Sequence, residues 1–211
     1  MATYQFQTEV NQLLKLIIHS MYSNKDIFLR EIVSNASDAL DKLKYLTVSD
    51  DKYKGITFSP RIDITFNEEK KVLTVQDTGI GMDEKDLGDN LGTIARSGTK
   101  AFIDMLNKES KSGDSNLIGQ FGVGFYSAFM AAEKIDVYTR KAGGDGKAWH
   151  WSSNGTNSYD IEELKLDSAE AKQYGFDKPE TTGSAIEMHL NDDSKEYASR
   201  WKIDELIKKY S

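Results

Sequence analysis

The chain has 211 residues, of which 38% are hydrophobic and 29% charged, so it is long enough for one domain with a substantial core. Its net charge of −7 argues against general affinity for duplex nucleic acid or an anionic membrane, and no apolar run reaches the length of a membrane-spanning helix. Cysteine is absent and the histidines lack metal-ligand spacing, which argues against disulfides, thiolate chemistry and zinc. The first ten residues, MATYQFQTEV, also lack the basic and apolar regions of a signal peptide. We therefore expect a soluble, cytoplasmic protein that binds neither nucleic acid nor membrane.

Two helices are predicted at the start of the chain. Apolar residues recur at helical spacing after Thr8, which indicates a first helix that ends before the segment YSNKD. Ser23 or Asn24 then offers an N-cap for a second helix, which we expect to reach about Tyr45.

Strands and turns dominate the remainder of the sequence. RIDITF and KVLTVQD alternate apolar and polar residues around NEEK, which predicts a β-hairpin with Asp77 at the end of its second strand. TGIGM reads as a turn, residues 83–106 as short helical stretches, and NKESKSGDSN as a loop. The segment LIGQFGVGFYSAFMAA passes from a glycine loop into an apolar helix. KIDVYTR and AWHWSS form a second predicted hairpin around KAGGDGK, TGSAIEMHL a further strand, and residues 197–211 a final helix. Helices combined with antiparallel hairpins indicate an α+β sandwich.

The second predicted helix carries an unusual polar stripe. At about 100° per residue, four polar side chains fall within a narrow arc beside the apolar face: Glu31, Asn35, Asp38 and Lys42. A stripe between core and solvent is where a helix would line a cleft. The alternative is ordinary: Asp38 and Lys42, four residues apart, would form a surface ion pair and Glu31 would be solvated.

Three loops contain glycine, and we expect them to lie near polar stripes: DTGIGM at 77–82, NLGTIARSGT at 90–99 and GQFGVGF at 119–125. Glycine allows close backbone approach, so such loops can present N–H groups to phosphate oxygens. Neither the P-loop motif nor the dinucleotide-binding motif is present, so a nucleotide site here would need a different fold. Each loop alone also reads as an ordinary turn or strand-to-helix connection. DTG is in addition the signature of aspartic proteases, but it occurs once, whereas that mechanism needs two acids.

The order of these motifs resembles the GHKL nucleotide-binding superfamily, which includes gyrase B, MutL, histidine kinases and heat-shock protein 90. The longer segments MYSNKDIFLREIVSNASDALDKLK, DTGIGM, LGTIARSGT and IGQFGVGFYSAF are similar to the N-terminal domain of heat-shock protein 90 chaperones of the bacterial HtpG type. The similarity covers nearly the whole chain. It implies a Bergerat-type two-layer α/β sandwich with a mixed, mostly antiparallel sheet that binds ATP or ADP with Mg²⁺.

The resemblance also implies roles for individual residues. Glu31 matches the general base that activates the attacking water, and Asn35 the magnesium ligand. Asp77 matches the carboxylate that accepts a hydrogen bond from the adenine amine, and Ser184 stands where the family usually has threonine. Arg96 stands where the family often has lysine, and a guanidinium differs from an ammonium in its fork geometry. The other ATP-binding positions implied are Asp38, Lys42, Gly81, Met82, Asn90, Leu91, Ser97, Gly119, Gln120, Phe121, Gly122, Val123, Gly124 and Phe125.

For the organisation of the protein, the resemblance implies one N-terminal ATP-binding domain over residues 1–211, with a mobile ATP lid at about 91–124 and Gly92, Gly98, Gly119 and Gly122 as hinges. The first strand, TYQFQ, resembles the segment that protomers exchange when the lids close. The middle domain, with a catalytic arginine, and the C-terminal dimerisation domain would be missing. We therefore expect a monomeric domain with weak ATPase activity, from a homodimeric chaperone that acts on client proteins, with or without co-chaperones. A nucleotide sensor without turnover and a gyrase-type or MutL-type ATPase are the alternatives.

Overall fold

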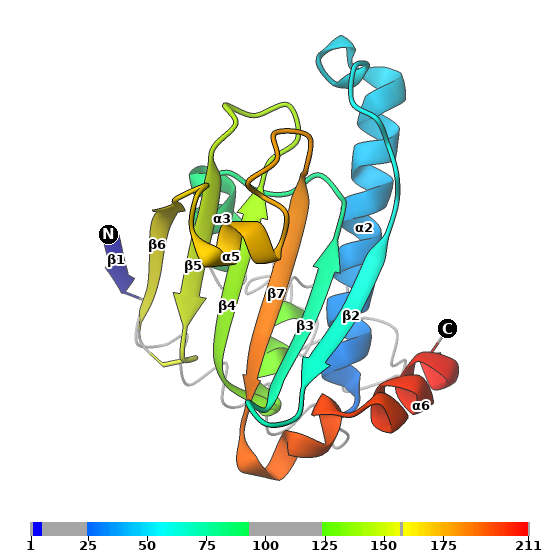
Figure 1. Cartoon of the computed structure of the whole chain (residues 1–211), viewed down its shortest axis with the longest axis vertical. Helices are drawn as coiled ribbons and strands as arrows, with labels where there is room; N and C mark the ends of the chain where they lie inside the picture. Colours follow the sequence, from blue (N-terminus) through cyan, green and yellow to red (C-terminus); the bar gives the residue numbers. More distant parts are fainter. Residues whose placement is uncertain (1, 6–24, 93–123, 157, 211) are drawn as a thin grey trace, which may run out of the picture.

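The protein is built on one antiparallel sheet of seven strands, as a computed structural model shows (Figure 1). The structure describes residues 2–5, 25–92, 124–156 and 158–210. The strands are arranged in the order β1-β6-β5-β4-β7-β3-β2, and every described pair is antiparallel. Their bounds are β1 Ala2–Gln5, β2 Ile62–Asn67, β3 Val72–Asp77, β4 Ala132–Arg140, β5 Ala148–Ser153, β6 Ser158–Leu164 and β7 Gly183–Leu190.

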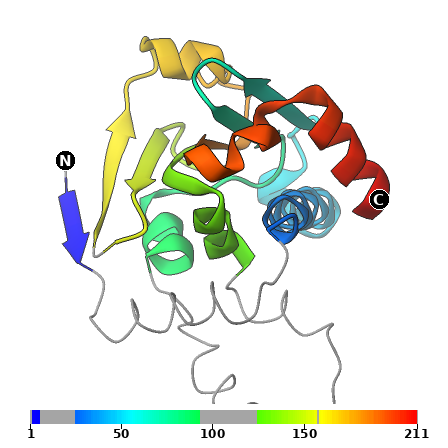
Figure 2. The same cartoon turned by 90° about the horizontal axis from the view of Figure 1, so that it is seen from below.

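Helices cover the two faces of the sheet unequally (Figure 2). The long helix α2 (Ile27–Ser49), the helix α3 (Glu84–Leu91) and the 3₁₀ helix η3 (Gly124–Met130) lie together on one face. The short helix α5 (Ala169–Gln173) lies on the opposite face. The 3₁₀ helix η4 (Asp192–Ala198) and helix α6 (Arg200–Tyr210) follow β7 and reach the start of α2, while the 3₁₀ helix η1 (Asp51–Tyr53) follows its end.

The main core lies between the sheet and the helices α2, α3 and η3. Alternation along β4 places Ile135 and Val137 on this side, where they pack with Phe28 and Ile32 of α2 and with Trp151 of β5. The opposite face carries a smaller cluster beneath α5: Tyr138, Ala148, Leu164, Ala171, Tyr174, Phe176 and Ala185. Because β4 is buried on both faces, its polar residues need partners within the protein.

The structure confirms the α+β sandwich, both hairpins, the strand of residues 183–190 and the final helix. No parallel pair occurs among the described strands, although the resemblance implied a mixed sheet. Helix α2 extends to Ser49, beyond the expected end at Tyr45. The predicted apolar helix after the glycine loop is a seven-residue 3₁₀ helix, η3.

The start of α2 is held by side-chain contacts that the sequence did not predict. Asp26 holds the N-cap position but makes no capping hydrogen bond with its side chain. Its carboxylate instead accepts a hydrogen bond from the Tyr197 hydroxyl at 2.9 Å and pairs with Lys202 and Lys209 at 3.4 and 3.3 Å. This acid therefore joins α2 to η4 and α6. The expected caps Ser23 and Asn24 lie outside the described residues.

Sequence reasoning missed β6 and α5. Tyr159 and Ile161 in SYDIEEL do alternate with polar residues, and they pack into the core. The predicted first helix and nearly all of the predicted lid lie outside the described residues. Within the described part of the chain, no helix is long and apolar enough to cross a membrane.

Candidate functional site

A cavity of about 590 Å³ lies between α2, α3, η3 and the sheet. The turn after β3 and the ends of β4 and β7 complete its walls. Its volume is in the range of small-molecule sites. The lining residues are Asn35, Ala36, Asp38, Ala39, Lys42, Leu46, Tyr53, Asp77, Ile80, Gly81, Met82, Asp86, Asn90, Leu91, Gly124, Phe125, Val137, Lys141, Ser184 and Ile186.

Helix α2 contributes three of the four residues of the predicted polar stripe to this cavity. Asn35, Asp38 and Lys42 all line it and are exposed to solvent within it. Among the described residues, no ion pair joins Asp38 to Lys42, so the ordinary interpretation as a surface pair does not apply. The helical periodicity thus predicted correctly which side of α2 faces a cleft.

Glu31, the fourth residue of the predicted stripe, does not line the cavity; it is 6% exposed and lies next to the lining residue Gly124. A Cβ placed on the lining residue Gly124 would come within 2.7 Å of Glu31 Oε2, so only glycine at this point lets η3 approach the carboxylate. Arg30 donates to the other carboxylate oxygen, Oε1, from Nη2 at 2.7 Å and from Nε at 3.1 Å. The carboxylate is therefore held by one cation and faces the cavity wall with its second oxygen.

Asp77 occupies the sheet end of the cavity, where β3 ends opposite Ser184 of β7. The side chain is almost fully buried, and this burial raises the pKa of Asp77 to about 6. Hydrogen bonds from the backbone N–H groups of Gly79 (2.8 Å) and Ser184 act in the other direction and offset only part of the rise. The result is a buried carboxyl group with acceptor capacity in the wall of the cavity.

The turn after β3 is fixed by a close backbone approach. Gly81 has φ of +62°, and a Cβ there would lie 2.0 Å from the carbonyl oxygen of Arg140 at the end of β4. On the other side, the Ile80 N–H donates to the Ala39 carbonyl of α2 at 3.1 Å. The DTGIGM segment is thus wedged between α2 and the sheet, which holds Asp77 and Met82 in the cavity wall.

Two residues that sequence reasoning missed also shape the site. Thr139 of β4 is completely buried behind Ser184 and hydrogen-bonds to it at 2.9 Å. Lys141 lines the cavity and pairs at 2.7 Å with Asp83 and with Asp86, which together form the capping box of α3. Burial lowers the pKa of Lys141, but these two carboxylates raise it overall to about 12. Strand alternation alone could have placed Thr139 on the inner face, whereas no sequence signal pointed to Lys141.

The other predicted site residues divide into two groups. Gly81, Met82, Asn90, Leu91, Gly124 and Phe125 line the cavity as expected. The rest lie outside the described residues: Arg96, Ser97, Gly119, Gln120, Phe121, Gly122 and Val123.

Among the residues that the structure describes, groups suited to a metal ion occur in two places. In the cavity, the Asn35 amide is an oxygen donor of the type that Mg²⁺ accepts when phosphate and water supply most of its ligands. On the opposite face of the sheet, strand pairing brings Asp136, Glu187 and His189 within 4.8 Å of one another, which their sequence spacing did not indicate. There the imidazoles of His150 and His189 already bond to the Asp136 carboxylate at 2.8 and 2.9 Å. These bonds hold the pKa of Asp136 well below its usual value despite burial.

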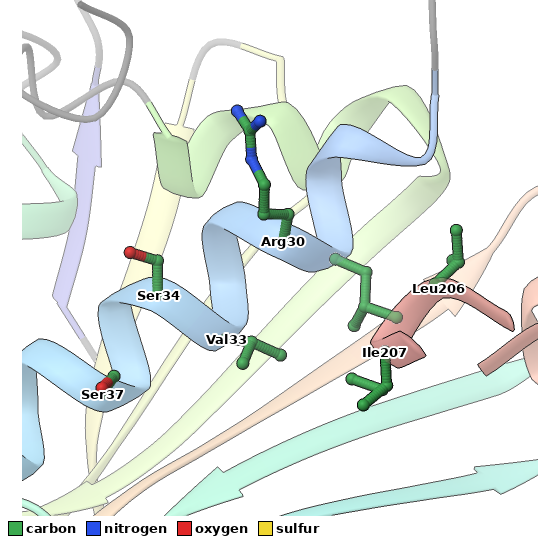
Figure 3. Close-up of a pocket in the computed structure, with 7 residues that line it drawn as sticks. Arg30, Val33, Ser34, Ser37, Leu206 and Ile207 are labelled. Atoms are coloured by element: carbon green, nitrogen blue, oxygen red, sulfur yellow. The ribbon is translucent and has the colours of Figure 1, made fainter. Parts of the chain in front are cut away.

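A second hollow, of about 300 Å³, lies between α2 and α6 (Figure 3). Val33 of α2 faces Leu206 and Ile207 of α6, and the α2 side is completed by Leu29, Arg30, Ser34 and Ser37. None of its described lining residues is a carboxylate or an amide. This second hollow therefore offers none of the carboxylate or amide oxygens that line the larger cavity.

Comparison with known proteins agrees with this geometry. Residues 22–181 match the family described as histidine kinase-, DNA gyrase B- and HSP90-like ATPases. The chain belongs to this ATPase family. It is 61% identical to the chaperone protein HtpG of Treponema denticola, 56% to that of Wolinella succinogenes and 54% to that of Treponema pallidum, in each case over all 211 residues. The chain spans about a third of the length of these relatives, 32% of each.

Proposed function

We propose that this domain binds ATP with Mg²⁺ in the large cavity and hydrolyses it to ADP and phosphate. One observation carries the proposal: Asp77 from the sheet and Asn35 from α2 line the same cavity, at its buried and exposed ends respectively. Such a cavity suits a ligand with a flat polar ring at one end and charged groups at the other. A nucleoside triphosphate has this character.

The buried end suits adenine. An ionised Asp77 only accepts hydrogen bonds, and the exocyclic amine of adenine offers hydrogen at the corresponding ring position. Guanine has a carbonyl oxygen there, which would place two acceptors against each other in a poorly hydrated site. Leaving such buried groups unpaired is costly, so Asp77 favours ATP over GTP.

The exposed end suits the phosphates. Lys42, two helical turns after Asn35 on the same face of α2, supplies positive charge, and the amide oxygen of Asn35 would hold Mg²⁺. Bound there, Mg²⁺ would neutralise charge on the phosphate oxygens. Glu31 lies one helical turn before Asn35, with its Oε2 toward Gly124, and would orient the attacking water and take its proton.

Beyond this domain, we propose that the whole protein is a chaperone, since the relatives are named chaperone protein HtpG. In that view, closure of a lid at residues 91–124 over the nucleotide times the clamp cycle of a homodimer that acts on client proteins. Residues 1–211 form its single N-terminal domain, and a middle domain completes the catalytic site. A cytoplasmic location fits a chain without cysteine.

Two variants test the assignment, with ATP binding measured by calorimetry and turnover by phosphate release. Glu31→Ala should retain binding and lose hydrolysis, because it removes the base and leaves the cavity lining intact. Asp77→Asn should lose binding itself. If Glu31→Ala hydrolyses ATP at the wild-type rate, Glu31 is not the base; if the wild type releases no phosphate even within the full-length protein, the domain is a nucleotide sensor.

A further inference from the structure

Thr139 is a buried polar residue that does not itself line the cavity. Its side chain is fully excluded from solvent, and its hydroxyl has three partners. These are the backbone N–H of Met82, the carbonyl oxygen of Gly183 and the hydroxyl of Ser184, each at 2.9 Å. Met82 and Ser184 both line the cavity. Thr139 therefore joins two walls of the site from behind.

Counting hydrogens fixes the direction of every bond in this group. A hydroxyl has one hydrogen to donate and two lone pairs with which to accept. The Gly183 carbonyl only accepts, so it receives the Thr139 hydrogen, and the Met82 N–H occupies one Thr139 lone pair. In the third bond Thr139 has no hydrogen left, so Ser184 must be the donor. The Ser184 hydrogen thus points into the protein, toward Thr139.

This direction has a consequence for the cavity. With its hydrogen committed to Thr139, the Ser184 oxygen offers only lone pairs to a ligand. Asp77, paired with Ser184 across β3 and β7, likewise offers only acceptor atoms when it is ionised. A group that reaches this pair, directly or through water, must approach with hydrogen toward it.

We propose that Thr139 is a positioning residue that fixes Ser184 as an acceptor and so contributes to the selection of an amine-bearing purine over a carbonyl-bearing one. The inference rests on the proposed function, because it concerns how the same cavity discriminates between the purine bases of nucleotides. Without the Thr139 hydroxyl, Ser184 would be able to rotate its hydrogen into the cavity. It would then donate to a ring carbonyl, which the wild-type arrangement forbids.

Inosine triphosphate is the probe for this idea, since it differs from ATP in having a carbonyl in place of the amine and a hydrogen on the adjacent ring nitrogen. The measured quantity is the ratio of the two dissociation constants from calorimetry. Thr139→Val keeps the shape and removes the hydroxyl, and it should reduce the preference for ATP about tenfold, the effect of one hydrogen bond. Thr139→Ser retains the hydroxyl and should keep the wild-type ratio.

A purely structural role for Thr139 gives a different result. Loss of the Met82 and Gly183 bonds alone would weaken both nucleotides by the same factor and leave the ratio unchanged, which would overturn the proposal. Ser184→Ala provides a second test if Thr139→Val does not fold: removal of the Ser184 hydroxyl should also reduce the preference, and an unchanged ratio would contradict the proposal. Failure of the proposed function is distinguishable, because the wild type would then bind neither nucleotide.

Discussion

The charge on Asp77 should destabilise the nucleotide-free domain, and this cost is measurable. Burial raises the pKa of Asp77 from its ordinary 3.8 to about 6, so the folded state holds the proton more tightly than the unfolded state does. The difference corresponds to about 3 kcal/mol, since each tenfold change in proton affinity is worth about 1.4 kcal/mol. Asp77→Asn removes the charge but keeps an oxygen that accepts from the Gly79 N–H. The variant should therefore be more stable than the wild type by up to about 3 kcal/mol at pH 8.

The sign of the pH dependence follows from the direction of the shift. A carboxyl group with a raised pKa in the folded state lowers stability above that pKa, and the penalty disappears as the pH falls through 6 toward 3.8. The stability advantage of Asp77→Asn should thus be small near pH 4 and grow to its full value by pH 8. All other titrating groups are shared by the two proteins and cancel in this difference.

Urea denaturation of the nucleotide-free domain between pH 4 and pH 8 provides the measurement. Asp51→Asn, at an exposed carboxylate of η1, controls for loss of a negative charge at the surface. Calorimetry at pH 8 should show in parallel that Asp77→Asn no longer binds ATP. An advantage that does not change with pH would refute the reasoning, because it would mean that folding does not penalise the ionised carboxylate.

Two further predictions concern the turn and the outer face of the sheet. Gly81→Ala should lower the free energy of unfolding, measured in urea, by more than Gly146→Ala does. Both glycines have positive φ, and a side chain in that conformation costs about 1–2 kcal/mol. Only at Gly81 would the added Cβ also collide with the Arg140 carbonyl. Equal losses would show that the turn relaxes without strain. Hydrogen bonding to Asp136 raises the pKa of His189 to about 9, so this pair should stabilise the domain fully below pH 6.5 and lose its effect as the pH rises through 9. His189→Gln should show a smaller loss of stability than the wild type between pH 7 and pH 10, and identical pH profiles would contradict the pairing.

Helical periodicity was enough to predict one wall of the site. Helix α2 is continuous, so residues at helical spacing fall on one face: Asn35, Asp38 and Lys42. This spacing does not depend on what the helix packs against. Alternation likewise predicted that Asp77 ends β3 and is followed by a turn, whereas its place in the site was implied only by the resemblance to the family. In both cases the relevant geometry is contained in one continuous segment.

Partners that depend on strand order could not be predicted in this way. Thr139 and Ser184 are 45 residues apart and meet only because β4 lies beside β7 in the sheet. The same pairing brings His189 to Asp136, with His150 arriving from β5 on the other side. A single sequence gives the alternation of each strand but not which strand is its neighbour. The contacts that orient the site are therefore the ones that sequence reasoning missed.

The two ends of the cavity should consequently tolerate substitution to different degrees. At the sheet end, Asp77 and Ser184 are buried, so solvent cannot compensate a mismatched hydrogen bond and we expect strong discrimination between bases. At the helix end, Asn35 and Lys42 are exposed, so water and salt reduce the effect of any one charge. Replacing one cationic side chain by another at the helix end should accordingly alter nucleotide affinity only modestly. Substitutions of Ser184 or Thr139 should be tolerated less, because their hydroxyl groups are hydrogen-bonded to each other. We therefore expect selectivity for the base to depend on the sheet end, and the helix end to supply charge that neighbouring groups can replace.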